Sequence, residues 1–164
     1  MTEVNQIPKP YFFENDISGI QINPDSSLYG LWEIERELKQ EDQGEYPGLI
    51  ITVRMVVNSD TCQIAAKCIY SEEVTNYTPI YNCSFKLIED SLIISNANQL
   101  ERFFVIHPTE RNSGSCSYSA NTLFSENNNL VKMTVDSEGK LNSEIEIDTN
   151  EVVPFYEESF TKIK

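Results

Sequence analysis

The polarity of the chain alternates from residue to residue along Ser27–Gln40. Trp32, Ile34 and Leu38 occupy even positions, and glutamates fill odd positions between them. A period of two residues gives a β-strand one apolar face and one polar face. A helix is the alternative, but it would place Trp32 outside the apolar stripe. The pattern therefore favours one long strand that carries the only tryptophan of the chain.

Similar alternation recurs in further short segments, which are separated by turns rich in polar residues, glycine and asparagine. These segments are Leu49–Val57, Thr61–Tyr70, Tyr77–Ile88, Ser91–Ser95, Glu101–Ile106, Cys116–Phe124, Leu130–Val135, Leu141–Ile147 and Phe155–Ile163. With no convincing helix between them, they predict an all-β antiparallel fold. The expected architecture is a barrel of about eight to ten strands, with a two-sheet β-sandwich as the alternative.

The first part of the chain differs from the rest. Residues 1–27 contain three prolines and no sustained period, so we expect an extended N-terminal lead-in before a single barrel domain at 28–164. The aromatic residues Tyr11, Phe12 and Phe13 in this lead-in are expected to dock on the barrel by ordinary packing. If they were exposed instead, they would mark a partner site.

The chain is strongly acidic, with 26 acidic against 12 basic residues and a formal charge of −14. This charge repels phosphate backbones and anionic lipid heads, so we expect no nucleic-acid partner and no membrane insertion. No apolar run is long enough to span a membrane, and the start of the chain lacks a secretion signal, so the chain as written would stay where it is made. Four cysteines in a small β-rich chain nevertheless favour a mature secreted or periplasmic form, with the cytoplasm as the alternative.

Strand parity predicts that all four cysteines point inward. Cys62 and Cys68 lie on one strand about 20 Å apart, whereas bridged Cα atoms lie about 5.5 Å apart, so these two cannot pair. We favour the pairs Cys68–Cys83, across a hairpin, and Cys62–Cys116. The alternative is four reduced cysteines that act as small hydrophobic residues. Their spacing matches no zinc motif, and we expect neither a metal nor a cofactor.

Catalytic machinery is not recognisable in the sequence. The only histidine, His107, precedes a proline in an expected loop, where a solvated side chain is the usual outcome. No phosphate-binding loop and no nucleophile motif is present. We therefore predict a non-catalytic protein.

A candidate ligand site lies inside the expected barrel, where inward positions carry polar, cationic and large apolar side chains. The candidate lining residues are Arg36, Met55, Tyr70, Tyr81, Phe85 and Tyr118. A buried guanidinium requires a partner, so Arg36 either pairs with an inward acid or binds the carboxylate of a ligand. The alternative is that these side chains simply fill the barrel. The site predicts binding of a small apolar or amphipathic molecule.

Two acidic rows suggest a different function. One row is formed by Glu33, Glu35 and Glu37, and the other by Glu144, Glu146 and Asp148. Both rows are expected to face water, and as neighbours they would form a negative stripe. The alternative prediction is therefore an acidic module that binds a basic protein, such as an inhibitor of a basic enzyme or toxin.

The residues Gly30-Leu31-Trp32 open the first long strand of this antiparallel chain, and they resemble the Gly-x-Trp signature of lipocalins and lipocalin-like proteins. The resemblance implies structural roles for Gly30 and Trp32, with the tryptophan packed across the closed end of an eight-stranded barrel. In that family an arginine of the last strand caps the tryptophan, and Lys162 or Lys164 is the nearest equivalent here. The acidic-aromatic turn and the helix after the barrel, both usual in the family, are not recognisable.

Overall fold

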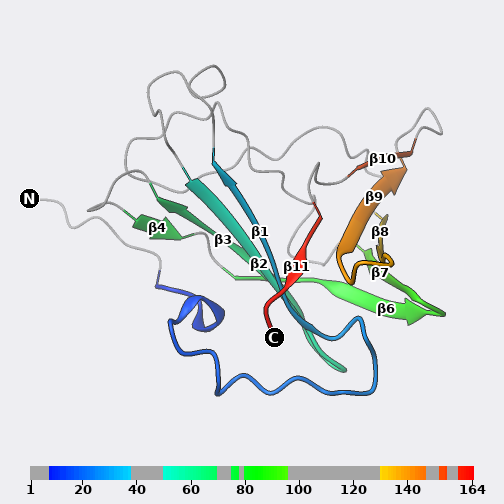
Figure 1. Ribbon diagram of the computed structural model, residues 1–164, viewed down its shortest axis with the longest axis horizontal. Helices are drawn as coiled ribbons and strands as arrows, with labels where there is room; N and C mark the ends of the chain where they lie inside the picture. The colour runs from blue at the N-terminus through cyan, green and yellow to red at the C-terminus, as the bar shows by residue number, and fades with distance from the viewer. Residues whose placement is uncertain are drawn as a thin grey trace, which may run out of the picture.

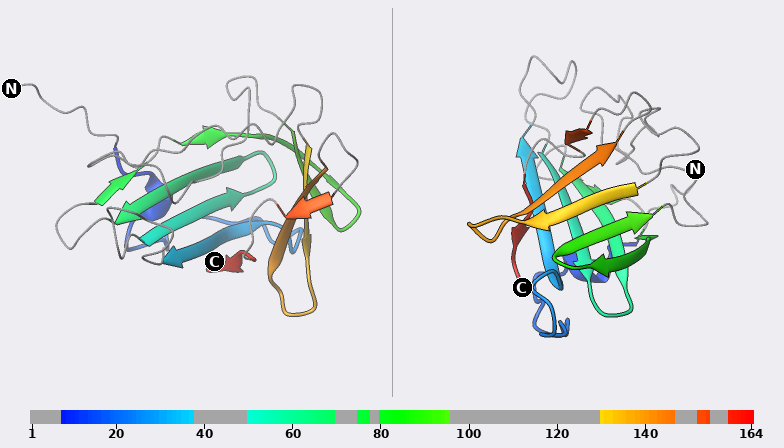
Figure 2. Two further views of the ribbon diagram at one scale, coloured as in Figure 1. Left: turned by 90° about the horizontal axis from the view of Figure 1, so that it is seen from above. Right: turned by 90° about the vertical axis from the view of Figure 1, so that its right-hand side faces the viewer.

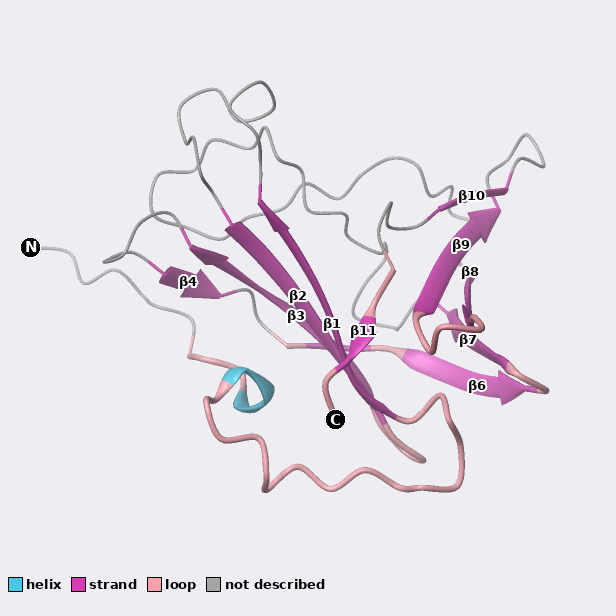
Figure 3. Ribbon diagram, in the orientation of Figure 1, coloured by secondary structure: helices cyan, strands magenta, loops and turns pink. Residues whose placement is uncertain are grey.

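The computed structural model describes residues 8–37, 50–69, 75–77, 80–95, 130–146, 152–154 and 159–164. For Arg36 and Tyr81, among others, it describes the backbone alone. The elements, drawn in Figure 1 and coloured by type in Figure 3, are the 3₁₀ helix η1 (Tyr11–Phe13) and the strands β1 (Gly30–Glu37), β2 (Ile50–Val57), β3 (Cys62–Ile69), β4 (Thr75–Tyr77), β5 (Tyr81–Asn82), β6 (Ser84–Ile88), β7 (Ser91–Ser95), β8 (Leu130–Val135), β9 (Leu141–Glu146), β10 (Val152–Pro154) and β11 (Thr161–Lys162).

The strand interpretation of the alternating segments is confirmed. The strands β1, β2, β3, β7, β8, β9 and β11 each lie inside a predicted segment, so the helical alternative around Trp32 is wrong. The segment predicted as one strand at Tyr77–Ile88 is divided, because β5 ends at Asn82 and β6 begins at Ser84. The predicted strands Glu101–Ile106 and Cys116–Phe124 lie outside the described residues.

The described strands form two antiparallel sheets. The first has the order β11-β1-β2-β3-β4, with β5 also paired to β3, and the second has the order β10-β9-β8-β7-β6. Figure 2 shows that the strands of the second sheet run steeply across those of the first. The all-β antiparallel prediction is confirmed, but these ladders form two sheets rather than one closed barrel.

One hydrophobic core lies between the two sheets. In the central strands of the first sheet, Trp32, Met55 and Ile64 are paired in register across β1, β2 and β3, and all three are buried. The remaining buried members are Leu28, Ile34, Ile51, Val53, Val57, Cys62, Ala66, Cys68, Leu92, Ile94, Val131, Met133, Leu141 and Phe160. Because both sheets contribute, neither apolar face is left to solvent by this packing.

The two sheets meet at two junctions. At the first, Cys83 alone separates β5 from β6, so the chain passes directly from one sheet to the other. At the second, Leu141 in β9 and Phe160, just before β11, exchange backbone hydrogen bonds of 2.9 and 2.8 Å. The second sheet is therefore joined to both sides of the first.

The outer face of the first sheet is covered by the N-terminal segment, residues 8–27 (Figure 1). Phe12 and Phe13 are buried and pack against Leu31, Val56 and Ala65. The side chain of Tyr11 remains 47% exposed. The predicted docking of the aromatic triplet is thus confirmed for the two phenylalanines. Consequently the first sheet is covered on both faces, which explains why so many consecutive residues of β2 are buried.

Candidate functional site

The Trp32 side chain is buried in the core between the two sheets. It is 1% exposed, and its indole Nε1–H donates a hydrogen bond of 3.0 Å to the carbonyl oxygen of Leu28. A buried indole N–H needs such an acceptor, since leaving it unpaired costs the full desolvation of the donor. The bond fixes the orientation of the ring at the start of β1.

Gly30 allows the last strand to approach β1. A Cβ atom at this position would lie 2.8 Å from the carbonyl oxygen of Lys164 and would also collide with the Lys162 side chain. The two segments are joined by backbone hydrogen bonds from Leu31 N to Lys164 O, at 3.1 Å, and from Ile163 N to Leu31 O, at 2.8 Å. Glycine is required here because of close packing rather than backbone torsion.

The side chain of Lys162 lies over the tryptophan. Lys162 is paired with Trp32 across β11 and β1, and its Nζ lies 5.3 Å from the centroid of the indole ring. The same ammonium group donates to the carbonyl oxygen of Ser27 at 3.2 Å. A cation over an aromatic face contributes about 0.5–1 kcal/mol when exposed. Two lysines were candidates for covering the tryptophan ring, and Lys162 is the one that lies over it.

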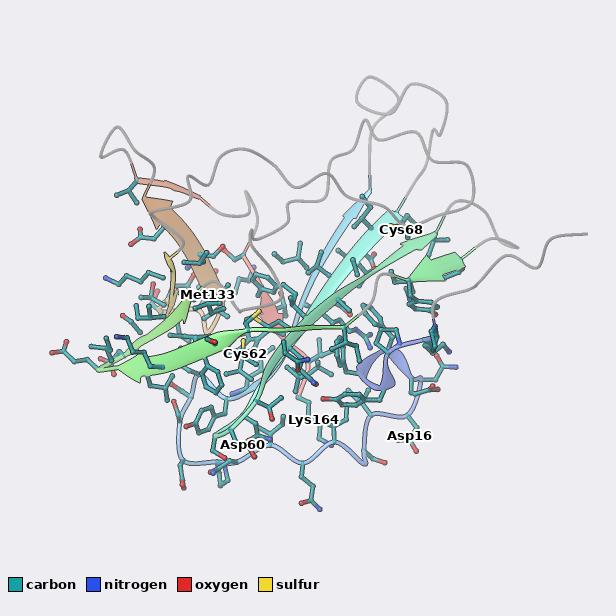
Figure 4. The ribbon with its side chains drawn as sticks, turned by 180° about the vertical axis from the view of Figure 1, so that it is seen from behind. Asp16, Asp60, Cys62, Cys68, Met133 and Lys164 are labelled. Carbon is teal, nitrogen blue, oxygen red and sulfur yellow. The ribbon has the colours of Figure 1, made fainter. Side chains whose placement is uncertain are left out.

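Lys164, which is labelled in Figure 4, has a different role. Its Nζ donates to the carbonyl oxygens of Ile17, at 2.7 Å, and Ser18, at 3.0 Å. This lysine therefore anchors the N-terminal segment to the residues that follow β11.

The predicted ligand-lining residues divide into three groups. Met55 is fully buried in the core, and Phe85 on β6 is half-buried and packs against it. Arg36 is paired with Ile51 and Tyr81 with Ile64 along the backbone, and their side chains are outside the description. The last two candidates, Tyr70 and Tyr118, lie outside the described residues. The structure thus brings Met55 and Phe85 to one core and leaves the other four as predictions.

Both predicted disulfides are wrong in the structure. Cys62 and Cys83 are free, which excludes Cys68–Cys83 and Cys62–Cys116. The reason is the strand register: β3 pairs Gln63 with Asn82 in β5, so Cys83 falls beside Cys62, while Cys68 is paired with Asn76.

The two free cysteines contact each other directly. The backbone N–H of Cys83 donates to the carbonyl oxygen of Cys62 at 2.8 Å, and the interaction between the two thiols shifts the pKa of each. This thiol contact, together with burial, raises the pKa of Cys62 well above its ordinary value. The same interaction lowers the pKa of Cys83. Of the two sulfurs, Cys83 is therefore the one on which negative charge is more stable.

The acidic rows are less continuous than expected. Glu33 does not simply face water, because Arg54 Nε donates to its Oε2 at 2.7 Å. The same guanidinium donates to the carbonyl oxygen of Phe12 at 2.7 Å and lies 5.1 Å from the Phe13 ring centroid. Glu35 and Glu144 are exposed. Their strands, β1 and β9, belong to different sheets and do not pair, so strand pairing does not merge the rows into one stripe.

Sequence reasoning did not identify Arg54 as a link between the sheet and the N-terminal segment, or Cys62 and Cys83 as a pair. For Arg54 the available signal was its place in the alternating pattern, which puts its side chain on the outer face of the sheet, as for Glu33.

Comparison of the chain with protein-family models, curated proteins and solved structures gives no match. In the part of the chain that the structure describes, no helix has the length and apolar character needed to cross a membrane.

Proposed function

We propose that this chain is a non-catalytic binding protein that holds a small apolar or amphipathic molecule inside a lipocalin-like barrel. The observation that carries the proposal is the closed end built by Gly30, Trp32 and Lys162. A buried tryptophan, a glycine that admits the last strand and a cation stacked on the indole correspond to the roles implied by the Gly-x-Trp resemblance.

The two junctions between the sheets support a barrel. When β5 and β6 are taken as one bent strand through Cys83, the strand order β11-β1-β2-β3-β5/β6-β7-β8-β9 contains eight members. The last member returns to the first through the Leu141–Phe160 bridge. Eight strands enclose just enough space for side chains or for one small ligand.

The position of Met55 indicates where a ligand would lie. Because Met55 is 0% exposed and paired with Trp32, it belongs to the floor of the site rather than to its wall. A ligand would therefore rest above this floor, against Phe85 on the opposite sheet. We propose Arg36, further along β1 from Trp32, as the partner of a ligand carboxylate. We further propose that the mature protein acts outside the cytoplasm.

The proposal is tested with 11-(dansylamino)undecanoic acid, a fluorescent fatty acid. Trp32 is the only tryptophan, so energy transfer from its indole to the dansyl group reports occupancy of the barrel. Native mass spectrometry of the purified chain, before and after delipidation, gives an independent measure. Saturable energy transfer together with a retained one-to-one complex supports binding. Neither a retained compound nor a saturable signal would refute it.

A charge-matched pair of variants tests the proposed anchor. Arg36→Gln removes one positive charge from the proposed site, and Lys132→Gln removes one from an exposed position on β8. A charge-assisted hydrogen bond contributes about 1.5–3 kcal/mol, so we expect Arg36→Gln to raise the Kd about tenfold or more. Lys132→Gln should change it less than about twofold, because an exposed charge is screened. Equal effects of the two substitutions would refute the role of Arg36.

The second candidate function is an acidic module that binds a basic protein. The formal charge of −14 and the exposed Glu35 and Glu144 favour it, but the pairing of Glu33 with Arg54 weakens the first row. A pull-down at low and high salt tests it, since association by an exposed charged face weakens as salt rises. A partner whose capture is insensitive to salt would contradict the electrostatic mechanism.

A further inference from the structure

Cys62 and Cys83 face each other at the junction where the chain passes from the first sheet to the second. Cys62, at the start of β3, is 3% exposed, and Cys83, between β5 and β6, is half-buried. Both thiols are free, and the backbone N–H of Cys83 donates to the carbonyl oxygen of Cys62. Figure 4 labels Cys62 near this junction and Cys68 at the far end of β3.

The backbone geometry suits a covalent bond between these two residues. The pairing of Gln63 with Asn82 makes Cys62 and Cys83 the next opposed residues of the β3–β5 ladder. Opposed residues of antiparallel strands have Cα atoms about 4.5–5.5 Å apart, which lies within the range of about 4.4–6.8 Å found for disulfides. The backbone spacing expected at this position is therefore compatible with a disulfide.

The neighbouring side chains hold this register in place. The Gln63 amide Nε2 donates to Asn82 Oδ1 at 2.8 Å, and the Tyr11 hydroxyl donates to Gln63 Oε1 at 2.5 Å. These two hydrogen bonds connect β5, β3 and the N-terminal segment one residue away from the cysteines. A slip of β5 along β3 by one residue would break the Gln63–Asn82 bond, which therefore helps to keep Cys83 opposite Cys62.

We propose that Cys62 and Cys83 are a modification site that forms a reversible disulfide by exchange with a small-molecule disulfide of the glutathione class. This pair differs from either bridge expected from the sequence. Its role is independent of the ligand-binding proposal, because neither sulfur belongs to the candidate lining.

The exchange proceeds in two steps. The Cys83 thiolate attacks one sulfur of glutathione disulfide, so a mixed disulfide forms and one glutathione thiolate leaves. The Cys62 sulfur, after losing its proton, then attacks the Cys83 sulfur and displaces the second glutathione thiolate. Two protein thiols are oxidised, one external disulfide is reduced, and the two released thiolates take up the two protons. The greater exposure and lower pKa of Cys83 favour it as the sulfur that attacks first.

The test is disulfide mapping of the full chain. The protein is reduced with dithiothreitol, freed of reductant, incubated with glutathione disulfide, and alkylated with iodoacetamide. Trypsin together with a glutamyl endopeptidase then places the cysteines on separate peptides. Cleavage gives Met55–Lys67 for Cys62 and Val74–Lys86 for Cys83, while Cys68 leaves on a third peptide. A linked Met55–Lys67/Val74–Lys86 species that disappears after dithiothreitol treatment is the expected product.

Thiol counting provides the quantitative result. With Ellman's reagent in denaturant, the oxidised chain should lose the two thiols of Cys62 and Cys83 in addition to the loss at Cys68, which is itself disulfide-bonded, and the Cys62→Ser variant should instead retain one glutathione on Cys83. If glutathione stays on wild-type Cys83 without closure, or if Cys62 and Cys83 are both still alkylated, the proposal is overturned. Linkage of Cys83 to Cys68 or Cys116 would also overturn it. The wild-type mapping decides the matter by itself if Cys62→Ser does not fold.

Discussion

The close approach at Gly30 leads to a specific prediction for the Gly30→Ala variant. The added methyl group would lie 2.8 Å from the Lys164 carbonyl oxygen, and real Cβ contacts essentially never fall below 3.0 Å. That carbonyl oxygen accepts the Leu31 N–H, and the next backbone bond runs from Ile163 N to Leu31 O. The substitution must therefore move β11 away from β1 rather than shift a flexible side chain.

The magnitude follows from the interactions that this movement weakens. Each backbone hydrogen bond has a net value of about 0.5–1.5 kcal/mol, and the contact of Lys162 with Trp32 adds about 0.5–1 kcal/mol. Alanine recovers about 0.5–1 kcal/mol relative to glycine within a strand, because the unfolded chain loses conformational freedom. We expect Gly30→Ala to lower the free energy of unfolding by a net amount of about 1–2 kcal/mol.

Urea unfolding followed by the fluorescence of Trp32 measures this loss. With an m-value of about 2 kcal/mol per molar, the midpoint should fall by about 0.5–1 M. Gly19→Ala is the matched control, since nothing lies within 4 Å of a Cβ at that position, and it should leave the midpoint unchanged or raise it slightly. Indistinguishable midpoints for the two variants would show that β11 is not held against Gly30 in this way.

Three further predictions concern charged groups. Hydrogen bonds, first of all from an asparagine side chain, lower the pKa of Asp136. The contribution of this carboxylate to stability is therefore present above pH about 4 and is lost as the pH falls towards the folded-state pKa. The urea midpoint of Asp136→Asn should consequently change less between pH 6 and pH 3 than that of the wild type, and an equal change in both proteins would contradict this. Arg54→Met should lower the free energy of unfolding by about 1–2 kcal/mol because Glu33 loses its partner, and adding Glu33→Gln should recover part of the loss in a double-mutant cycle; additive effects would show that the pair is not coupled. Lys162→Met should lower the free energy of unfolding, measured with urea, by about 0.5–1 kcal/mol, whereas Lys162→Arg should not lower it. An unaltered midpoint in Lys162→Met would mean that the cation over Trp32 contributes nothing to stability.

Strand positions were predictable because a sheet with one apolar face imposes a two-residue period on the sequence. The period located β2, β3, β7, β8 and β9 within the predicted segments. It also placed Glu33 on the outer face, but it could not reveal that this face is covered. The covering segment has no period of its own, so its docking through Phe12 and Phe13 becomes visible only in three dimensions.

The predicted disulfides were wrong because strand parity does not determine which residues lie opposite each other. Parity states which face a residue occupies, whereas pairing depends on how two strands are aligned. With Gln63 opposite Asn82, the register brings Cys83 beside Cys62 and takes it six positions away from Cys68. Counting outward from the expected turn at 71–76 would place Cys83 opposite Ile64, whereas the observed ladder pairs Ile64 with Tyr81. Four of the six candidate lining residues stay predictions because their side chains are not among those that the structure describes.

The segment that covers the first sheet also has a consequence for colloidal behaviour. Leu31, Val56 and Ala65 are shielded from water by Phe12 and Phe13, and the shield is held by a few polar anchors such as Arg54 and Lys164. Detachment of this segment by heat or by proteolytic nicking would uncover an apolar sheet surface without unfolding the strands beneath it. Such a species would self-associate, so aggregation of this protein should begin with the release of its own N-terminal segment.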